Sequence, residues 1–278
     1  MPIGVQNTLI AVFSYNMGKL LEFCVDSVQL NCADFKLLII DDNSDDAVTQ
    51  QVLARLQDRG IQVHVNRSAK DGKKHGNLYA NIRYACDVAT QSGLRYLLMV
   101  QDDMQLVRPL SEAVLQEYSD VLAANEFYFQ IDPRFLMRRP YEYLPETGTF
   151  RHGGLMSYAD VGFLDLDRLQ RSGWTLRDGE RENGYGLRER GYLRVFPRTP
   201  VMMHVPFPVR YRNGMLKRSL LIPNRGRYRF AQMSQDEIVA MDGRPDEVAP
   251  IYRNLLRVEP MGLARVAYLW LRDTKIFS

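Results

Sequence analysis

Short apolar segments alternate with helical patterns over the N-terminal part of the chain. The segments are Thr8 to Phe13, Phe35 to Ile40 and Tyr96 to Val100, which are mostly apolar, and Ile61 to Val65, in which apolar and polar residues alternate. Between them, apolar residues recur at the spacing of one helix face over Lys19 to Leu30, Ala47 to Arg59 and Leu78 to Thr90. Strands that alternate with helices of this length predict an α/β fold with a mostly parallel, doubly wound central sheet.

The pattern changes after Asp103. Helices are predicted over Ser111 to Ala124 and Arg177 to Arg190, the second ending at Gly191. Strands are predicted over Glu126 to Ile131, Leu193 to Phe196 and Val201 to Val205, with a short strand or turn leading into a helix over Asp160 to Leu169. The segment from Asp132 to Gly148 has no clear periodicity, so we expect an irregular loop region on the substrate side.

Polar residues follow three of these apolar segments where the predicted strands end. Ser14, Tyr15 and Asn16 follow the first, Asp41 to Asp46 follow the second, and Asp102 and Asp103 follow the fourth. Because ligands of open α/β sheets bind outside the carboxyl ends of the strands, these residues are expected to meet at a binding edge. Paired carboxylates suit a hard divalent cation, and a solvated turn is the alternative for this pair alone. Asp45 and Asp46 also suit the positive N-terminal end of the helix that follows them.

Composition indicates a globular protein and narrows its partners only a little. The chain has 278 residues, 46% of them apolar, and a formal net charge of +3, which gives no reason to expect a nucleic-acid partner. Three cysteines without metal-type spacing fit a reducing compartment. The sequence shows neither a signal-peptide pattern nor an apolar run of membrane-spanning length. The expected location is therefore cytoplasmic, including a peripheral position on the inner face of a membrane.

Basic residues dominate the segment from Val205 to Phe230, which contains no Asp or Glu. Such a segment predicts a loop that faces an anion, and a solvated surface is the plainer alternative. The remainder, Ser234 to Ser278, is expected to form short helices. Within it, Leu263 to Leu271 is amphipathic and is expected to dock on the domain, with a membrane surface as the alternative.

Three groups of segments form one ordered pattern: Ala11 to Asn16 with Leu38 to Asp46, then Val100 to Asp103, then Glu180 to Tyr192 with Pro200 to His204. Together they resemble the inverting family 2 glycosyltransferases of the GT-A fold. The resemblance implies a single GT-A-like domain over residues 1–205, with a nucleotide-sugar-binding half (7–108) and an acceptor half (109–205). A basic lid loop and a C-terminal helical extension would follow over residues 206–278.

The resemblance also implies the substrates and most of the site. It implies a UDP-, GDP- or dTDP-linked sugar as donor, a glycan or lipid-linked acceptor, and a bacterial surface-polysaccharide pathway as the setting. Asp103 matches the acid that binds Mn or Mg, Asp102 lies nearer the ribose or donor sugar, and Asp42 matches the acid that binds the base. The remaining implied contacts are Ser14, Tyr15 and Asn16 along the nucleotide, Lys74 and Asn77 at the phosphates, and His204 as a further metal ligand or a core histidine.

An inverting transfer also needs a carboxylate that removes the proton of the acceptor hydroxyl. Glu180 and Glu182 compete for this role, and Glu182 is slightly preferred, although the family usually opens this helix with a Glu-Asp pair. Two other functions remain as alternatives. One is a non-catalytic sugar-nucleotide or glycan-binding module, and the other is a nucleotidyltransferase, which would usually have a more Gly-rich first turn. No motif specifies the sugar, the base, the acceptor or the oligomeric state.

Overall fold

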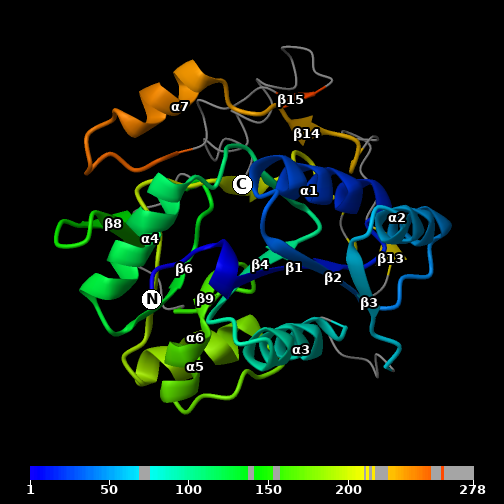
Figure 1. The fold of residues 1–278 in the computed structure, drawn as a ribbon, viewed down its shortest axis with the longest axis horizontal. Helices are drawn as coiled ribbons and strands as arrows, with labels where there is room; N and C mark the ends of the chain where they lie inside the picture. The colour runs from blue at the N-terminus through cyan, green and yellow to red at the C-terminus, as the bar shows by residue number, and fades with distance from the viewer. Residues whose placement is uncertain are drawn as a thin grey trace.

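A seven-stranded sheet with helices on both faces forms the centre of the protein (Figure 1). The computed structural model describes residues 1–68, 76–136, 141–152, 157–209, 211–212, 215–216, 225–251 and 258–259. In spatial order the strands are β10 (Leu193–Val195), β6 (Tyr128–Ile131), β9 (Gly162–Asp165), β4 (Tyr96–Gln101), β1 (Thr8–Ser14), β2 (Lys36–Asp41) and β3 (Gln62–Val65). Only β9 runs antiparallel to its neighbours β4 and β6 within this sheet. The predicted mostly parallel α/β sheet is therefore confirmed.

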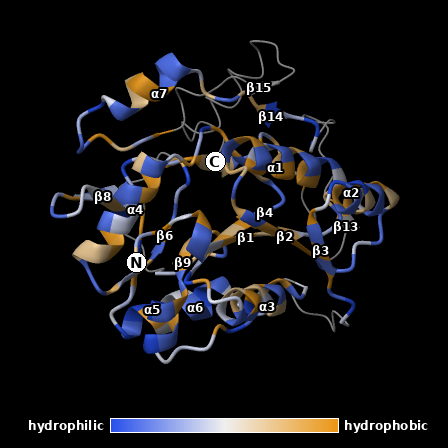
Figure 2. Ribbon diagram, in the orientation of Figure 1, coloured by the Kyte–Doolittle hydropathy of each residue, from blue (hydrophilic) through white to orange (hydrophobic). Residues whose placement is uncertain are grey.

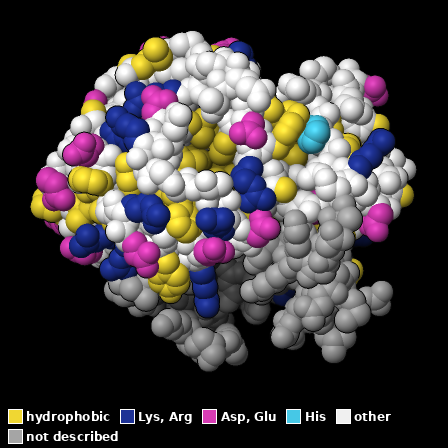
Figure 3. Space-filling view, turned by 90° about the horizontal axis from the view of Figure 1, so that it is seen from below, with side chains coloured by type: hydrophobic (Ala, Val, Ile, Leu, Met, Phe, Trp, Pro, Cys, Tyr) yellow, Lys and Arg dark blue, Asp and Glu magenta, His cyan; other side chains and the backbone are white. Residues whose placement is uncertain are grey.

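The helices divide between the two faces of the sheet, and each face has its own apolar core. On one face lie α1 (Gly18–Asn31), α2 (Ala47–Asp58) and α4 (Glu112–Ala124), and on the other lie α3 (Leu78–Gln91), α5 (Leu166–Arg171) and α6 (Glu180–Glu189). Figure 2 shows the apolar residues along the strands and the inner helix sides. Figure 3 shows acidic and basic side chains interspersed over the α3, α5 and α6 face, as expected for a solvated surface.

The helix starts follow from local capping. Asp46 is the N-cap of α2, where its side chain accepts a hydrogen bond from the Thr49 backbone N–H at 2.9 Å. This confirms the capping role predicted for this acid. Ser111 caps α4 in the same way, accepting from the Val114 backbone N–H. The starts of α2 and α4 are thus closed by side chains of the chain itself.

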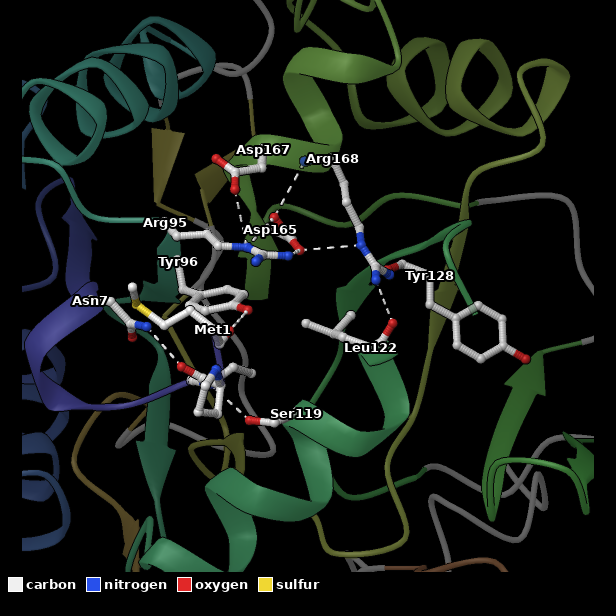
Figure 4. A network of polar contacts seen from close by, with 12 residues as sticks. Met1, Asn7, Arg95, Tyr96, Ser119, Leu122, Tyr128, Asp165, Asp167 and Arg168 are labelled. Carbon is white, nitrogen blue, oxygen red and sulfur yellow. Dashed lines mark hydrogen bonds and ion pairs between the residues drawn. The ribbon is translucent and has the colours of Figure 1, made fainter. Parts of the chain in front are cut away.

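A buried ion-pair network lies at the opposite end of β4 from Asp102 (Figure 4). Asp165, the last residue of β9, is fully buried and accepts from Arg95 at 2.8 Å and 3.2 Å. Its second partner is Arg168 at 3.3 Å, whose guanidinium also donates to backbone carbonyls including that of Leu122. The network joins β4, β9, α4 and α5, so it stabilises the fold far from the predicted site.

Replacing Asp165 with Ala is expected to lower the free energy of unfolding by about 3–5 kcal/mol, because Arg168 would keep a buried charge without its carboxylate. Urea unfolding measures this change. The matched control is Asp167→Ala, since Asp167 contacts the same Arg95 at 3.3 Å but its side chain is 59% exposed. Asp167→Ala should lower the free energy of unfolding by no more than about 1 kcal/mol. Equal losses in the two variants would contradict the structural role of Asp165.

Two small sheets of two strands each, formed by the central part of the chain, are separate from the seven-stranded sheet. β5 (Met104–Leu106) follows the Asp102–Asp103 turn and pairs antiparallel with β11 (Met202–His204). A hairpin forms from β7 (Tyr141–Leu144) and β8 (Thr149–His152). The prediction of an irregular loop over Asp132 to Gly148 was therefore wrong for this part, because the pairing depends on a cross-strand register that a single short segment does not reveal.

The described part of the C-terminal extension packs on the central domain. It contains β12 (Tyr211–Arg212), β13 (Met215–Leu216), β14 (Arg229–Phe230), α7 (Gln235–Asp242) and β15 (Val258–Glu259). Arg108 is buried and forms a bidentate ion pair with Asp242 at the end of α7, at 2.7 Å and 2.8 Å. The predicted amphipathic helix at Leu263 to Leu271 lies outside the described residues. Over the described parts of the chain, no helix has the length and apolar character needed to cross a membrane.

The predicted helix that ends near Gly191 is confirmed, but it begins at Glu180 rather than Arg177 and its cap also differs. The helix α6 ends at Glu189 and its C-cap is Arg190, so Gly191 lies one position beyond the cap. Gly191 has a φ of 83°, the left-handed conformation that glycine adopts without strain. The glycine therefore ends the helix as expected, although the cap itself is one residue earlier.

Candidate functional site

The carboxyl edge of the sheet carries the acids that the sequence placed there. β1 lies between β2 and β4, with Ser14 opposite Asp41 and Phe13 opposite Gln101. The backbone N–H groups of Asp42 and Asp102 donate to the carbonyls of Ser14 and Phe13, at 2.9 Å and 3.0 Å. The pairing of the strands thus continues past their ends and brings these two acids to opposite sides of β1.

Asp102 faces inward. Its side chain is buried, and one carboxylate oxygen accepts a hydrogen bond from the Tyr15 backbone N–H at 3.0 Å. Burial, and then the neighbouring charge of Asp103, raises the pKa of Asp102 well above its usual range. Asp102 therefore fixes the loop after β1 and forms a wall of the site beneath that loop.

Asp103 faces outward and is paired with His204. Its side chain is 25% exposed, and its Oδ1 lies 3.5 Å from Nδ1 of His204. The ribbon of β5 and β11 sets this geometry, because Val205 donates its backbone N–H to the Asp103 carbonyl at 2.8 Å. Burial alone would raise the pKa of Asp103, but the hydrogen bond and charge of His204, with Arg134 behind it, lower it overall. Asp103 is thus an ionised and accessible carboxylate.

The donor set of Asp103 and His204 fits a divalent cation. A carboxylate oxygen and an imidazole nitrogen are both ligands for Mn, and an ionised carboxylate also suits Mg. Among the residues that the structure describes, no three His, Cys, Asp or Glu side chains come together as a complete metal site.

Asp42 and Asn77 bind each other. Asn77 donates its backbone N–H to Oδ2 of Asp42 at 3.1 Å and its side-chain amide to Oδ1 at 2.9 Å. Both side chains are buried, and Asn77 is also the N-cap residue of α3. A carboxylate has about four lone-pair sites, so Asp42 keeps acceptor capacity beyond these two bonds. Lys74, the other predicted phosphate contact, lies outside the described residues.

Asn16 joins the loops after β1 and β2. It has a φ of 52°, and its backbone N–H donates to the Ser44 hydroxyl at 2.8 Å. Its side-chain oxygen accepts from the backbone N–H groups of Asp45 and Asp46, at 3.0 Å and 3.2 Å. Of the three residues predicted to line the nucleotide, Ser14 is buried in β1, Tyr15 contacts Asp102, and Asn16 mainly holds the pocket edge together.

A second cluster of charges lies beside β6 and β10 of the sheet, and sequence reasoning missed it. Asp132 follows β6 and is fully buried, and Arg134 binds it with two hydrogen bonds at 2.6 Å and 2.8 Å. Arg194 approaches the same carboxylate at 3.4 Å. Burial alone would raise the pKa of Asp132, but the two arginines lower it overall. Asp132 ends a buried apolar strand just as Asp102 does, so the same rule could have found it.

Arg134 connects the two clusters. One of its guanidinium nitrogens lies 3.4 Å from Nε2 of His204, while the other two bind Asp132. Asp160 belongs to the same group, because burial raises its pKa while Arg134 opposes that shift and Asp103 adds to it. The site is therefore one continuous set of charges that runs from β5 to β10.

Glu180 and Glu182 differ in burial, and Glu180 interacts electrostatically with this charged group. Glu180, the first residue of α6, is half-buried, and burial followed by the charge of Asp160 raises its pKa against the opposing effect of Arg194 and Arg134. Glu182 is exposed on the same helix. The two candidates for the base are thus separated by orientation, which the sequence spacing alone did not reveal.

The start of α6 is held by Asn183 and Trp174. Asn183 is fully buried, and its amide oxygen accepts from Nε1 of Trp174 at 3.0 Å and from the Arg177 backbone N–H at 2.7 Å. Its amide nitrogen donates to the Arg177 carbonyl at 3.0 Å. Gly186 lies directly against the indole ring, where a Cβ atom would collide with it. These contacts fix the helix turn that carries Glu180.

The sequence pattern described as "Glycosyl transferase family 2" matches residues 9–157, which is more than half of the chain. The chain belongs to glycosyl transferase family 2. The family 2 match includes Asp42, Asp102 and Asp103 but ends before Glu180 and His204. The family match therefore does not cover Glu180 and His204, and only the structure places them beside the other site residues. No protein with a curated description matches the sequence.

Solved structures similar to this family 2 chain include S. aureus TarS, at 11% identity, 73% coverage of this chain, 37% of that chain, and a TM-score of 0.47. A mannosyltransferase, PcManGT from Pyrobaculum calidifontis in complex with GDP-Man and Mn²⁺, matches at 13% identity over 69% of this chain and 54% of that chain, with a TM-score of 0.46. A cytidylyltransferase from Leptospira borgpetersenii matches at 9% identity over 97% of this chain and 96% of that chain, with a TM-score of 0.43. The chain thus spans only 37% of TarS and 54% of the mannosyltransferase chain.

Proposed function

We propose that this protein is a metal-dependent inverting glycosyltransferase that uses a nucleotide-diphosphate sugar and a glycan or lipid-linked acceptor. One observation carries the proposal. The accessible pair of Asp103 and His204 and the half-buried Glu180 border the same charged group, with Arg134 between them. A site of this kind can hold a leaving diphosphate on one side and an attacking hydroxyl on the other.

On the donor side, Asp103 and His204 would hold the cation. A cation bound there would neutralise charge on the leaving diphosphate. Asp102 supports the loop backbone at Tyr15, so the pocket wall keeps its shape while the phosphates bind. The spare acceptor capacity of Asp42 suits an N–H group of the nucleotide base, and Ser14 and Lys74 stay in the proposal as further nucleotide contacts.

On the acceptor side, Glu180 would act as the general base in preference to Glu182. In a single displacement, the acceptor oxygen bonds to the anomeric carbon as the bond to the diphosphate oxygen breaks, and the hydroxyl proton passes to Glu180. Attack from the face opposite the leaving group inverts the anomeric configuration. A raised pKa suits the role, because a carboxylate with higher affinity for protons is a stronger base.

The test is a panel of UDP-, GDP- and dTDP-sugars with Mn or Mg, assayed for release of the nucleoside diphosphate. We expect release with at least one donor, faster release with a hydroxyl acceptor, and loss of release when EDTA is added. NMR of the product reports the anomeric configuration. Binding without turnover over a broad acceptor panel would instead favour a non-catalytic binding module. Pyrophosphate formation from a nucleoside triphosphate and a sugar 1-phosphate would favour a nucleotidyltransferase.

A further inference from the structure

Asp160 lies in the middle of the charged edge of the sheet. It comes shortly before β9, which lies between β4 and β6 and runs antiparallel to both. An antiparallel strand starts at the edge where its neighbours end. Asp160 therefore lies between the turn that follows β4, at Asp103, and the turn that follows β6, at Asp132.

Two glutamines hold the backbone around Asp160. Gln101, the last residue of β4, donates its Nε2 to the Asp160 carbonyl at 2.7 Å. Gln130 of β6 is fully buried and donates its Nε2 to the carbonyls of Ala159 and Val161, at 2.7 Å and 2.9 Å. Its Oε1 accepts from the Ala159 backbone N–H at 2.9 Å. The backbone of residues 159–161 is thus fixed from both neighbouring strands, although it precedes β9.

The carboxylate of Asp160 is left for a ligand. Asp160 is half-buried, and within the part of the chain that the structure describes its carboxylate has no hydrogen bond or ion pair with another residue. Asp132, at the same edge, instead binds the Arg134 guanidinium at 2.6 Å and 2.8 Å. A carboxylate has about four acceptor sites, so an acid held in place without a protein partner is available to hydroxyl donors.

Asp160 also lies close to both reacting sides of the proposed transfer. The charges of Asp103 and His204 act on Asp160, and Asp160 is the first of the charges that act on Glu180. In a single displacement the anomeric carbon lies between the leaving diphosphate and the attacking hydroxyl. The transferred sugar ring therefore occupies the space between the cation pair and Glu180, which Asp160 borders.

We propose that Asp160 binds hydroxyl groups of the transferred sugar, and that it selects a neutral, hydroxylated sugar over a sugar acid. The proposal rests on the glycosyltransferase function proposed above and names the class of sugar that is transferred. The two oxygens of one carboxylate can accept from two neighbouring hydroxyls of a ring, and hydrogen bonds to a charged group are the stronger ones. A uronic acid would instead bring a second carboxylate towards Asp160 and Asp103, where like charges repel.

Isothermal titration calorimetry with Mn²⁺ compares UDP-glucose with UDP, GDP-mannose with GDP and dTDP-glucose with dTDP. We expect at least one of these nucleotide sugars to bind. Asp160→Ala should raise the Kd of that nucleotide sugar about tenfold, because hydrogen bonds to a charged group are lost, without raising the Kd of the matching nucleoside diphosphate. The retained diphosphate binding shows that the nucleotide pocket is folded.

The matched control is Asp178→Ala. Asp178 is an exposed acid whose carboxylate already pairs with Arg83 at 2.9 Å. This variant should keep the Kd of both the nucleotide sugar and the nucleoside diphosphate. Thermal unfolding of both variants checks the rest of the fold.

The outcomes separate this inference from the proposed function. A selective loss of nucleotide-sugar binding in Asp160→Ala supports the inference even if no acceptor is glycosylated. An unchanged Kd, or an equal loss for the nucleotide sugar and its diphosphate, overturns the sugar contact. Tighter binding of UDP-glucuronic acid than of UDP-glucose overturns the selection of a neutral sugar. In each of these cases donor turnover by the unaltered protein leaves the proposed function standing, whereas binding of no nucleotide sugar overturns both.

Discussion

Asp103→Asn is expected to lower kcat by at least about 10³-fold, because the charge that would hold the cation against the diphosphate is lost. Asn has nearly the size of Asp, and Asp103 is partly exposed, so the fold should persist. Donor turnover gives kcat, Mn²⁺ binding followed by electron paramagnetic resonance gives the loss of the ligand, and thermal unfolding checks the fold. All three measurements use the full chain.

The matched control for Asp103→Asn is Asp87→Asn. Asp87 is an exposed carboxylate on α3, and the structure places it away from the strand ends that carry the site. It should keep both turnover and Mn²⁺ binding. Full activity of Asp103→Asn with unchanged Mn²⁺ binding would rule out a metal-binding role for this acid.

Glu180→Gln is expected to lower kcat by about 10²–10⁴-fold, whereas Glu182→Gln should stay within about twofold. The reason is orientation, since Glu180 borders the Asp160 and Arg194 charges while Glu182 is exposed. The two substituted residues lie two positions apart in the first turn of α6, so each variant serves as the control for the other. The reverse ranking would restore Glu182 as the base.

The pH dependence gives a second readout for Glu180. The pKa of Glu180 is raised, and a general base must be ionised to accept a proton. As the pH is lowered, kcat/KM of the unaltered protein should therefore begin to fall at a pH above the ordinary pKa range of Glu. Glu182→Gln should keep this acid limb, and the residual activity of Glu180→Gln should lack it. Because the pKa of Glu180 is higher in the folded than in the unfolded state, its ionisation lowers the stability of the folded protein at any pH above the unfolded-state pKa. Glu180→Gln should therefore not lower the unfolding midpoint at neutral pH.

The sequence predicted the β1–β4 part of the sheet well. Three of its strands are short apolar segments and β3 alternates apolar with polar residues, and the predicted segments at Thr8, Phe35, Ile61 and Tyr96 all correspond to strands of the structure. Local signals were sufficient there, because parallel strands buried on both faces need continuous apolar sequence. Asp102 and Asp103 could be placed for the same reason, since two charges cannot continue a buried strand.

The part of the sheet formed by β6, β9 and β10 was less predictable because its contacts are long-range. The pairing of β6 with β9 and the approach of Arg134 and Arg194 to Asp132 join segments that no periodicity connects. The different environments of Glu180 and Glu182 depend on how Asn183 and Trp174 anchor α6, which no spacing rule reveals. The hairpin β7–β8 was missed because each strand is only four residues long.

Arg134 has a thermodynamic consequence for the affinities of the two substrates in the proposed reaction. Its guanidinium lies against His204 on the proposed donor side and against Asp132 on the proposed acceptor side, so a charge that arrives at either place changes the potential at the other. Linkage requires that the factor by which the donor changes acceptor affinity equals the factor by which the acceptor changes donor affinity. A single side chain thereby makes the two half-sites a coupled pair.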